Sequence, residues 1–473
     1  MKVKKEILLT AINAKWIHPS LALRLLKANL GDLEDKCEII EFALRQPLAE
    51  MIEPLLAAAP LILGISVSIW NHLASAELLK ELEKLWKEKP VIILGGPEVS
   101  HLPPDAKIFE YADYVIKGEG ETAFRELCEN IMRGGTLCAY PKFISGACSD
   151  LNKIKTAYHL YTDEDTAKKL IYVEASRGCA FKCEFCLSSA ADDKVREFPL
   201  ERFLAEMDIL IQRGVKTFKF LDRSINTNIP RLLRIIEFFL EKINSISQTS
   251  TPLRLPTVHF EMVPSILPPE LLDALAKFPP CTLRLEIGIQ TLNPEVSARI
   301  SRPLKPQKDL HALRMLREKT NAIIHADLIA GLPGEDIKSF GRGFDLLWDA
   351  LSPNENETRY FSRIEIQLGI LKLLPGAPIS RHIENFGLRF SPLPPYEIEE
   401  TSSVSADDMN RIKNFARFWE LIVNRGLFVF REKPVFFEFM DLSDRLFSYF
   451  NRSWGIDKAE LIKFINNIKN ADN

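Results

Sequence analysis

The sequence predicts an α/β protein built from two successive series of strand–helix units and a helical C-terminal region. Apolar runs of strand length alternate with helical patterns from residue 1 to about 145, and again from 169 to about 382. Nearly continuous apolar strands that alternate with helices are typical of parallel sheets with both faces covered. After residue 382 the chain becomes Phe-rich and charged, which indicates a separate and mainly helical domain.

The first series, residues 1–145, is expected to form a Rossmann-like, doubly wound parallel sheet. The expected strands are Glu6–Ile12, Cys37–Phe42, Leu61–Ser68, Val91–Leu94 and Tyr114–Ile116. The expected helices are Ser20–Leu30, Leu73–Trp86 and Glu121–Met132. Sheets of this kind bind their ligands beyond the C-terminal ends of the strands.

Small polar residues and glycines stand at three of those strand ends. They are Ser66, Ser68, Gly95, Gly96, Gly118, Glu119 and Gly120. Glycine lets the backbone approach a ligand closely, so these positions are candidates for a binding site. Ordinary tight turns would also account for each of them alone, since glycine after a strand is common.

Residues 146–168 are expected to form a linker, because they are rich in charged and polar residues. The second series, residues 169–382, contains six strand candidates. They are Leu170–Val173, Thr217–Leu221, Thr257–Glu261, Thr282–Ile287, Ile323–Ile329 and Ile364–Leu371. In residues 383–473, helices are expected over Asp408–Asn424 and Asp457–Ile468. We interpret the aromatic residues of that accessory domain as core, with a lid over a substrate as the alternative.

Three cysteines follow the first strand of the second series. Cys179, Cys183 and Cys186 form a C-x3-C-x2-C run. Three thiolates on one short loop can hold three irons of a cubane cluster, and the fourth iron then stays open for another ligand. Structural zinc is the alternative, but it needs a fourth ligand, and no second cysteine pair follows.

The run, with Phe185 before its last cysteine, resembles the hallmark of the radical S-adenosylmethionine (SAM) superfamily. This resemblance implies a partial (β/α)6 barrel for residues 169–382, a [4Fe–4S] cluster on the three cysteines, and SAM on the open iron. It also implies that Phe185 packs near the adenine. The residues of a barrel that carry its chemistry lie at the C-terminal strand ends.

Polar residues further along the chain resemble signatures of the coproporphyrinogen III dehydrogenase-like branch of this superfamily. Glu261 ends a strand, Gln290 ends an E-x-G-x-Q motif, Arg302 ends I-x-R, and Asp327 begins D-L-I-x-G-L-P. By this resemblance Glu261 accepts from the SAM amino group, and Arg302 pairs with its carboxylate. Gln290 and Asp327 would hold the ribose and the methionyl end. Asp222, where the family usually has G-G-E-P, is a further candidate for the amino group. Each residue alone would also suit a surface salt bridge or a structural role.

The N-terminal region resembles the cobalamin-binding domain of cobalamin-dependent radical SAM enzymes. G-G-P at 95–97 and G-E-G-E at 118–121 match that pattern, which implies that the strand-end residues named above hold cobalamin. The chain departs from other cobalamin proteins because it lacks D-x-H-x-x-G, whose His ligates cobalt. We therefore expect His18 to be a loop or packing residue, while Lys15 and Trp16 could line the lower face of the cobalt.

The resemblance implies an enzyme that cleaves SAM reductively to a 5′-deoxyadenosyl radical and methylates an unactivated carbon of an unknown substrate. A radical rearrangement or cyclisation with both cofactors is the first alternative. A tRNA methylthiotransferase is less favoured, because Cys37, Cys128, Cys138 and Cys148 show no second cluster pattern. A cobalamin sensor is disfavoured by the intact three-cysteine run.

Composition sets the remaining limits. The 61 basic and 64 acidic residues among 473 give a net charge of −3, so nucleic acid is an improbable partner. The scattered cysteines do not indicate a disulfide framework, and we recognise neither a signal peptide nor a membrane span. We expect a cytoplasmic enzyme with a small-molecule or peptide substrate and an electron donor such as flavodoxin or ferredoxin.

Overall fold

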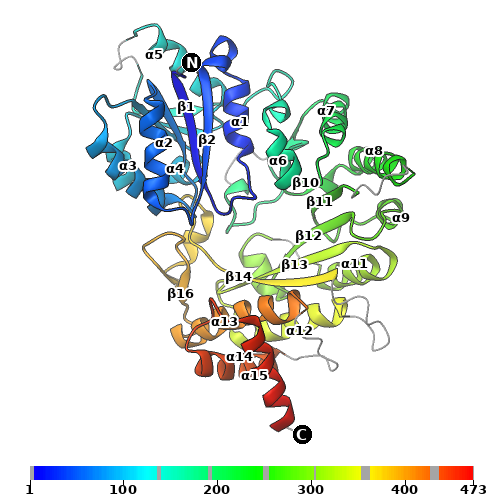
Figure 1. Ribbon diagram of the computed structural model, residues 1–473. Coiled ribbons are helices and arrows are strands. Elements are labelled where there is room, and N and C mark those ends of the chain that lie inside the picture. Colours follow the sequence, from blue (N-terminus) through cyan, green and yellow to red (C-terminus); the bar gives the residue numbers. More distant parts are fainter. Residues whose placement is uncertain are drawn as a thin grey trace.

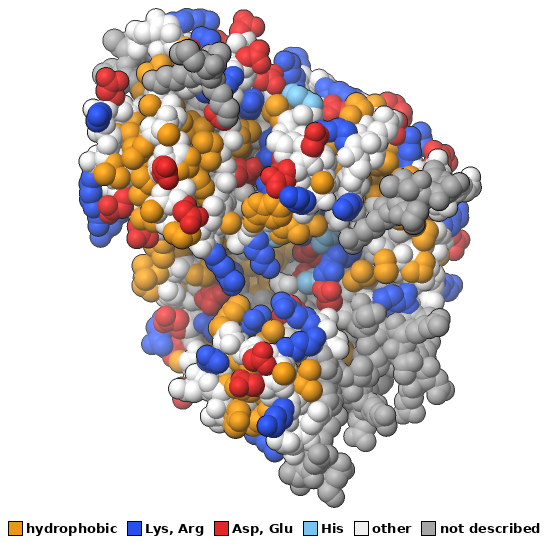
Figure 2. Space-filling view, viewed as in Figure 1, with side chains coloured by type: hydrophobic (Ala, Val, Ile, Leu, Met, Phe, Trp, Pro, Cys, Tyr) orange, Lys and Arg blue, Asp and Glu red, His pale blue; other side chains and the backbone are white. Residues whose placement is uncertain are grey.

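The computed structural model describes residues 5–135, 140–189, 194–248, 255–302, 305–352, 363–426 and 436–471. It contains two six-stranded sheets in which every neighbouring pair of strands is parallel. Figure 1 shows the N-terminal sheet in blue, the second sheet in green to yellow, and the C-terminal helices in orange to red on the far side of the second sheet. The predicted fold class is therefore confirmed. Figure 2 shows, in the same view, a surface that is hollowed between the upper and lower parts of the molecule.

The N-terminal sheet has the strand order β2-β1-β3-β4-β5-β6. Its strands are β1 (Ile7–Asn13), β2 (Cys37–Ala43), β3 (Ile62–Ser66), β4 (Val91–Gly95), β5 (Tyr114–Gly118) and β6 (Phe143–Gly146). The helices are α1 (Leu21–Ala28), α2 (Leu48–Ala58), α3 (His72–Leu85), α4 (Pro97–His101) and α5 (Glu121–Met132). The sequence reading did not include β6, α2 or α4. The chain runs from β1 to β2 in one direction along the sheet and from β3 to β6 in the other. In sheets of this type the reversal, here between β1 and β3, opens a crevice at the C-terminal ends of the strands.

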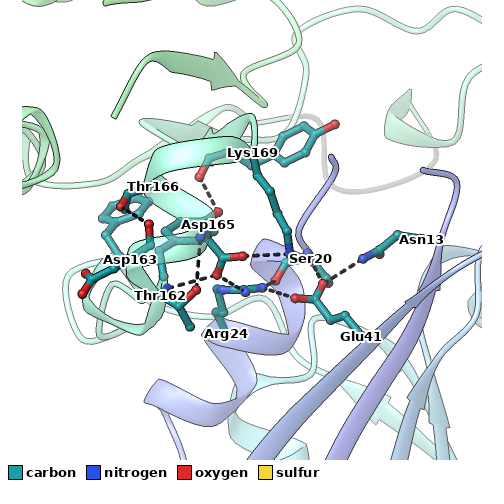
Figure 3. A network of polar contacts seen from close by, with 12 residues as sticks. Asn13, Ser20, Arg24, Glu41, Thr162, Asp163, Asp165, Thr166 and Lys169 are labelled. Carbon is teal, nitrogen blue, oxygen red and sulfur yellow. Dashed lines mark hydrogen bonds and ion pairs between the residues drawn. The ribbon is translucent and has the colours of Figure 1, made fainter. Parts of the chain in front are cut away.

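The expected linker is packed against the N-terminal domain rather than extended from it. It contains a 3-10 turn at Tyr158–Leu160 and helix α6 (Asp163–Lys168), which starts with a reciprocal cap between Thr162 and Asp165. Arg24 of α1 pairs with Asp165 at 2.8 Å and with Glu41 of β2 at 2.7 Å. Figure 3 shows this network joining α1, β2 and α6. Since Arg24 is only 4% exposed, the contact fixes α6 to the N-terminal sheet.

The second sheet runs β14-β13-β12-β11-β10-β7, in chain order from one edge to the other. Its strands are β7 (Ile171–Val173), β10 (Thr217–Phe220), β11 (Thr257–Met262), β12 (Leu283–Gln290), β13 (Ile323–Ala330) and β14 (Ile364–Ile370). The helices are α7 (Leu200–Gln212), α8 (Ile229–Ser247), α9 (Pro269–Ala276), α10 (Pro294–Arg299), α11 (Pro306–Lys319) and α12 (Ile337–Leu351). Figure 1 shows the helices on the outer side of this curved sheet, which is an open, partial barrel.

The C-terminal region packs on the outside of the barrel. Helices α13 (Ala406–Trp419), α14 (Phe436–Phe450) and α15 (Lys458–Ala471) follow the short strands β15 (Arg389–Phe390) and β16 (Ile398–Glu400). Phe415, Trp419 and Phe439 are buried. Phe415 and Trp419 stack on each other and make edge-to-face contacts with Phe439 and with Phe344 of α12. These rings are thus part of the core. No helix in the described part of the chain is long and apolar enough to cross a membrane.

Candidate active site

The three cysteines lie on the loop between the short strands β8 (Ser176–Arg177) and β9 (Arg196–Glu197). The loop begins at Gly178, whose φ of +96° suits glycine, and a Cβ there would lie 2.7 Å from the carbonyl oxygen of Lys194. Cys179, Cys183 and Cys186 all line the smaller of two cavities in the described structure, with a volume of about 190 Å³. Thiolates gathered in one cavity are the donors that an iron–sulfur cluster requires, so the residues fit that group.

The smaller cavity also collects five of the six residues predicted to bind SAM. Its lining includes Phe185, Glu261, Gln290, Arg302 and Asp327. They come from the cysteine loop, from β11, β12 and β13, and from the segment after α10. Five separate positions along the chain therefore meet at one mouth of the barrel.

Several polar atoms in this cavity lack the partners that buried groups normally have. The side-chain oxygen of Gln290 is buried without a hydrogen bond in the described part of the structure, and the backbone of Gln290 has φ +70°. Asp327 Oδ1 is also buried without a hydrogen bond of good geometry and lies 3.0 Å from Nε2 of His325 as an ion pair. Burial raises the pKa of Asp327. Unsatisfied acceptors beside three thiols fit a polar ligand such as SAM.

Arg302 lies at the floor of the same cavity. One terminal nitrogen donates to the sulfur of Cys183 at 3.2 Å, and the other donates to the carbonyl oxygen of Gly288. The guanidinium is therefore placed beside a predicted cluster ligand. Desolvation by burial raises the pKa of Cys183, while Arg302 opposes that rise.

Asp222 is the exception among the predicted SAM residues, and here the structure departs from the sequence reading. Its side chain is buried outside the smaller cavity and accepts hydrogen bonds from the Ala175 amide at 3.0 Å and the Ser176 hydroxyl at 2.5 Å. Burial raises its pKa to about 6 despite these bonds. Asp222 thus holds the start of the cysteine loop. The next residue, Arg223, lines the cavity instead.

A larger cavity of about 700 Å³ lies between the two sheets, at the C-terminal ends of β3, β4 and β5. Ser66, Gly95, Gly96, Gly118, Glu119 and Gly120 line it as expected for the cobalamin site. Ser68 does not, because its backbone is turned toward the side chain of Asn71, whose Oδ1 accepts from the Ser68 amide at 2.7 Å. Gly96 has φ +105°, and a Cβ there would lie 2.5 Å from the Val67 carbonyl oxygen. The strand ends are therefore packed closely where glycine stands, and they form a cradle beside a cavity whose volume suits a bulky ligand.

An ion network that the sequence reading missed closes the barrel side of the larger cavity. Arg177 pairs with Glu174 at 2.8 Å, with Glu121 at 2.6 Å and with Glu119 at 3.3 Å. Glu119 also pairs with Arg196 of β9. Burial raises the pKa of Glu174 to about 7, against the opposing effect of Arg177. These residues join the N-terminal sheet to the cysteine loop, and no motif in the sequence connects them.

His18 lies outside the lining of the larger cavity. Its Nδ1 is 2.9 Å from the hydroxyl of Tyr172 on β7, so it has a packing partner. Lys15 and Trp16 are not among the lining residues either, and Trp16 instead packs beneath Lys169. His18 is thus a packing residue, and Trp16 lies at the contact between the N-terminal loop and the start of the barrel segment.

Comparison with known proteins identifies both halves of the site. Residues 7–128 match the model of the B12 binding domain, and residues 173–347 match that of the radical SAM superfamily. The chain therefore belongs to the radical SAM enzymes that contain a cobalamin-binding domain. The predicted cofactors, a [4Fe–4S] cluster, SAM and cobalamin, are those of these two domain families.

The individual relatives are distant. The cobalamin-dependent radical SAM methyltransferase TokK of Streptomyces tokunonensis is 24% identical over 73% of this chain and 52% of its own length. The ribosomal protein uS12 methylthiotransferase RimO of Synechocystis sp. is 23% identical over 58% of this chain and 60% of its own. The chain thus spans about half the length of the curated relatives that it matches. The solved structure of the cobalamin-dependent SAM radical enzyme OxsB has the same fold, with a TM-score of 0.64, 14% identity, and coverage of 98% and 75%.

Proposed function

We propose that this enzyme transfers a methyl group to an unactivated carbon of a small molecule or peptide. The main support for this proposal is that the two cavities are neighbours: Cys186 and Arg223 line both of them. A SAM bound in the smaller cavity and a cobalamin bound in the larger one would then face a common junction. A substrate carbon at that junction would lie within reach of both cofactors, which is the arrangement that proximity catalysis needs.

The residues that line the smaller cavity have separate roles in this proposal. Cys179, Cys183 and Cys186 would hold the cluster, and Glu261, Gln290, Arg302 and Asp327 would orient SAM by its polar groups. Arg302 suits a carboxylate, because a guanidinium presents two parallel donors to it. When bound, the cluster and SAM supply a carbon radical, and cobalamin supplies the methyl group; the hard chemistry is the cofactors' own.

The chain itself would exclude water from the junction. Leu187, Leu221 and Leu374 line the barrel side of the larger cavity, and Leu21 and Leu25 line it from α1. Apolar walls slow the side reactions of a reactive intermediate with solvent. This lining supports radical chemistry, but it does not select a substrate.

Methylthio transfer is a second candidate, since curated relatives include methylthiotransferases. A methylthiotransferase would need a second cluster, held by cysteines of the N-terminal domain. Here Cys37 and Cys128 are buried in the apolar core of the N-terminal domain, and burial raises the pKa of both thiols. Cys148 is exposed, and Cys138 lies outside the described residues. The burial of two thiols favours methyl transfer over this alternative.

Product analysis with methyl-labelled SAM separates the candidates. Methyl transfer should give S-adenosylhomocysteine and 5′-deoxyadenosine in equal amounts, together with a product that gains the intact labelled methyl group and no sulfur. A rearrangement or cyclisation should give 5′-deoxyadenosine without S-adenosylhomocysteine, and that result would overturn the proposal. Methylthio transfer would give the same two coproducts as methyl transfer, but its product would gain a sulfur atom together with the labelled methyl group, and that result would also overturn the proposal. Candidate lipids, peptides and natural-product precursors are the substrates to test, with reduced flavodoxin or ferredoxin as electron donor in a cytoplasmic setting.

A further inference from the structure

Arg223 occupies a special position between the two cavities. It follows β10, and in the described part of the chain it shares with Cys186 alone the property of lining both cavities. Its side chain keeps 51% of its surface exposed. A half-exposed guanidinium at the junction can therefore reach a molecule placed there.

The guanidinium is held only loosely. Its one hydrogen-bonding partner among the described residues is Glu261, whose two carboxylate oxygens lie 3.4 and 3.5 Å from a single terminal nitrogen. The other two nitrogens make no hydrogen bond to the described residues. An arginine presents five N–H donors in a fixed fork, and a pair this long, whose arginine side chain is 51% exposed, contributes little to stability. Arg223 can exchange its partner at low cost.

Both terminal nitrogens of the other two guanidiniums around the junction have partners. Arg177 is shared by Glu119, Glu121 and Glu174. Arg302 donates to Cys183 and to the Gly288 carbonyl. Of the arginines that line these cavities in the described part of the chain, Arg223 is thus the one with a terminal nitrogen that makes no hydrogen bond.

We propose that Arg223 binds a carboxylate group of the substrate, after bound SAM has drawn Glu261 away from it. This inference rests on the proposed function, in which the SAM ammonium pairs with Glu261. A guanidinium and a carboxylate form two parallel charge-assisted hydrogen bonds. A carboxylate suits the junction better than a phosphate, because Glu174 and Glu261 border it and would repel a second negative charge.

Arginine labelling tests this without knowledge of the substrate. Phenylglyoxal is added to the anaerobically reconstituted full-length protein, and modification of each arginine is followed by peptide mass spectrometry. SAM should raise the labelling rate of Arg223 severalfold. Acetate, added with SAM, should then lower it roughly tenfold, the scale of one charge-assisted contact. Arg234 on α8, which is 42% exposed and pairs with Glu237, is the internal control and should not respond.

Two variants make the test specific. In Glu261→Gln, Arg223 should label quickly even without SAM. Arg223→Gln should retain wild-type SAM and cobalamin affinity, measured by spectral titration, as should the control Arg234→Gln. If Arg223→Gln weakens either cofactor tenfold or more, the guanidinium serves that cofactor and the proposal is wrong.

The remaining outcomes also decide the question. Protection by SAM itself would overturn the proposal, as would an absence of protection by acetate, or stronger protection by inorganic phosphate than by acetate. Iron and cobalamin content shows that the preparation is loaded, and the proposed function is checked separately by the product analysis with methyl-labelled SAM. Its failure therefore remains distinguishable from failure of the Arg223 assignment.

Discussion

The carboxylate of Glu184 accepts two hydrogen bonds from the guanidinium of Arg381, at 2.9 Å from Nε and 2.5 Å from Nη2. Glu184 lies between two of the cluster cysteines and is only 4% exposed. It also accepts from the hydroxyl of Ser301 at 2.5 Å, and it lies 2.9 Å from Nε2 of His382. The loop that carries the cysteines is therefore tied to the segment after β14 and to the neighbour of Arg302.

Glu184→Ala should weaken both the fold and the cluster site. Hydrogen bonds to charged groups contribute about 1.5–3 kcal/mol, and these bonds share one acceptor, so we expect a loss of about 3 kcal/mol. Arg381→Ala should cost much less, because the Arg381 side chain is 62% exposed and Glu184 keeps its other partners. Urea unfolding and iron retention measure the two effects. Equal losses in both variants would contradict this view of Glu184.

The cysteine assignment predicts the iron content. Anaerobically reconstituted wild type should hold about four irons per chain, and the triple variant Cys179→Ala, Cys183→Ala, Cys186→Ala should hold none of them and should not cleave SAM. Cys148→Ala is the matched control, since Cys148 is exposed and lies outside both cavities. Iron and sulfide analysis with paramagnetic resonance gives the result. If the triple variant retained the iron content of wild type, the three cysteines would not be the ligands of the cluster.

Arg302→Lys should weaken SAM binding roughly 10- to 150-fold, because lysine keeps the charge but loses the planar fork. The cluster should remain, although its spectrum should change slightly, since Arg302 donates to the sulfur of Cys183. SAM titration followed by the spectral change of the cluster provides the measurement. Arg314→Lys, in a surface pair with Asp349 at 3.6 Å, is the control. An unchanged affinity would make Arg302 a structural residue.

Gly96→Ala should reduce cobalamin binding by at least tenfold, because the new Cβ would collide with the Val67 carbonyl in the cradle. Gly134→Ala is the control, since Gly134 also has a positive φ, but a Cβ there meets nothing within 4 Å. Gly134→Ala should lose about 1–2 kcal/mol of stability from its left-handed backbone. Gly96→Ala should lose more because of the added collision, and only Gly96→Ala should lose cobalamin affinity. Equal affinities in the two variants would place cobalamin elsewhere.

The barrel interior should make stability depend on pH. His325 lies between Asp327 at 3.0 Å and Glu365 at 2.9 Å. These carboxylates raise its pKa to about 9, against the opposing effect of burial. Because the folded value exceeds the unfolded one, this contribution is complete below about pH 6.5 and is lost as pH rises through 9. It amounts to about 3 kcal/mol. The urea midpoint of unfolding should fall between pH 6 and pH 10 in wild type, and it should depend less on pH in His325→Gln.

Motifs made much of the site predictable, because short runs such as the cysteine triad and the strand-end glycines carry their geometry locally. That Glu261, Gln290 and Arg302 line one cavity was predictable in the same way, since each stands in a recognisable signature; their contacts with SAM stay predictions. Asp222 was misplaced, because only the tertiary structure shows which of two adjacent polar residues faces inward. The role of Arg177 was missed for a related reason. Two of its partners, Glu119 and Glu121, come from the N-terminal domain, over 50 residues away in sequence, and the periodicity of a sequence does not indicate such a contact.

Helix α1 belongs to two cores at once. Leu23 packs in the apolar core of the N-terminal sheet, whereas Leu21, Leu25 and Ala28 pack in the core that continues through the barrel. Arg24, which lies between Leu23 and Leu25 in the sequence, forms an ion pair with Asp165 of α6. A cut at residue 145 would expose an apolar stripe on α1 and would leave the buried Arg24 with only one of its two carboxylate partners, Glu41. The two halves are thus not interchangeable modules: a cobalamin domain moved onto another barrel would have to bring along, or redesign, the surface that receives α1.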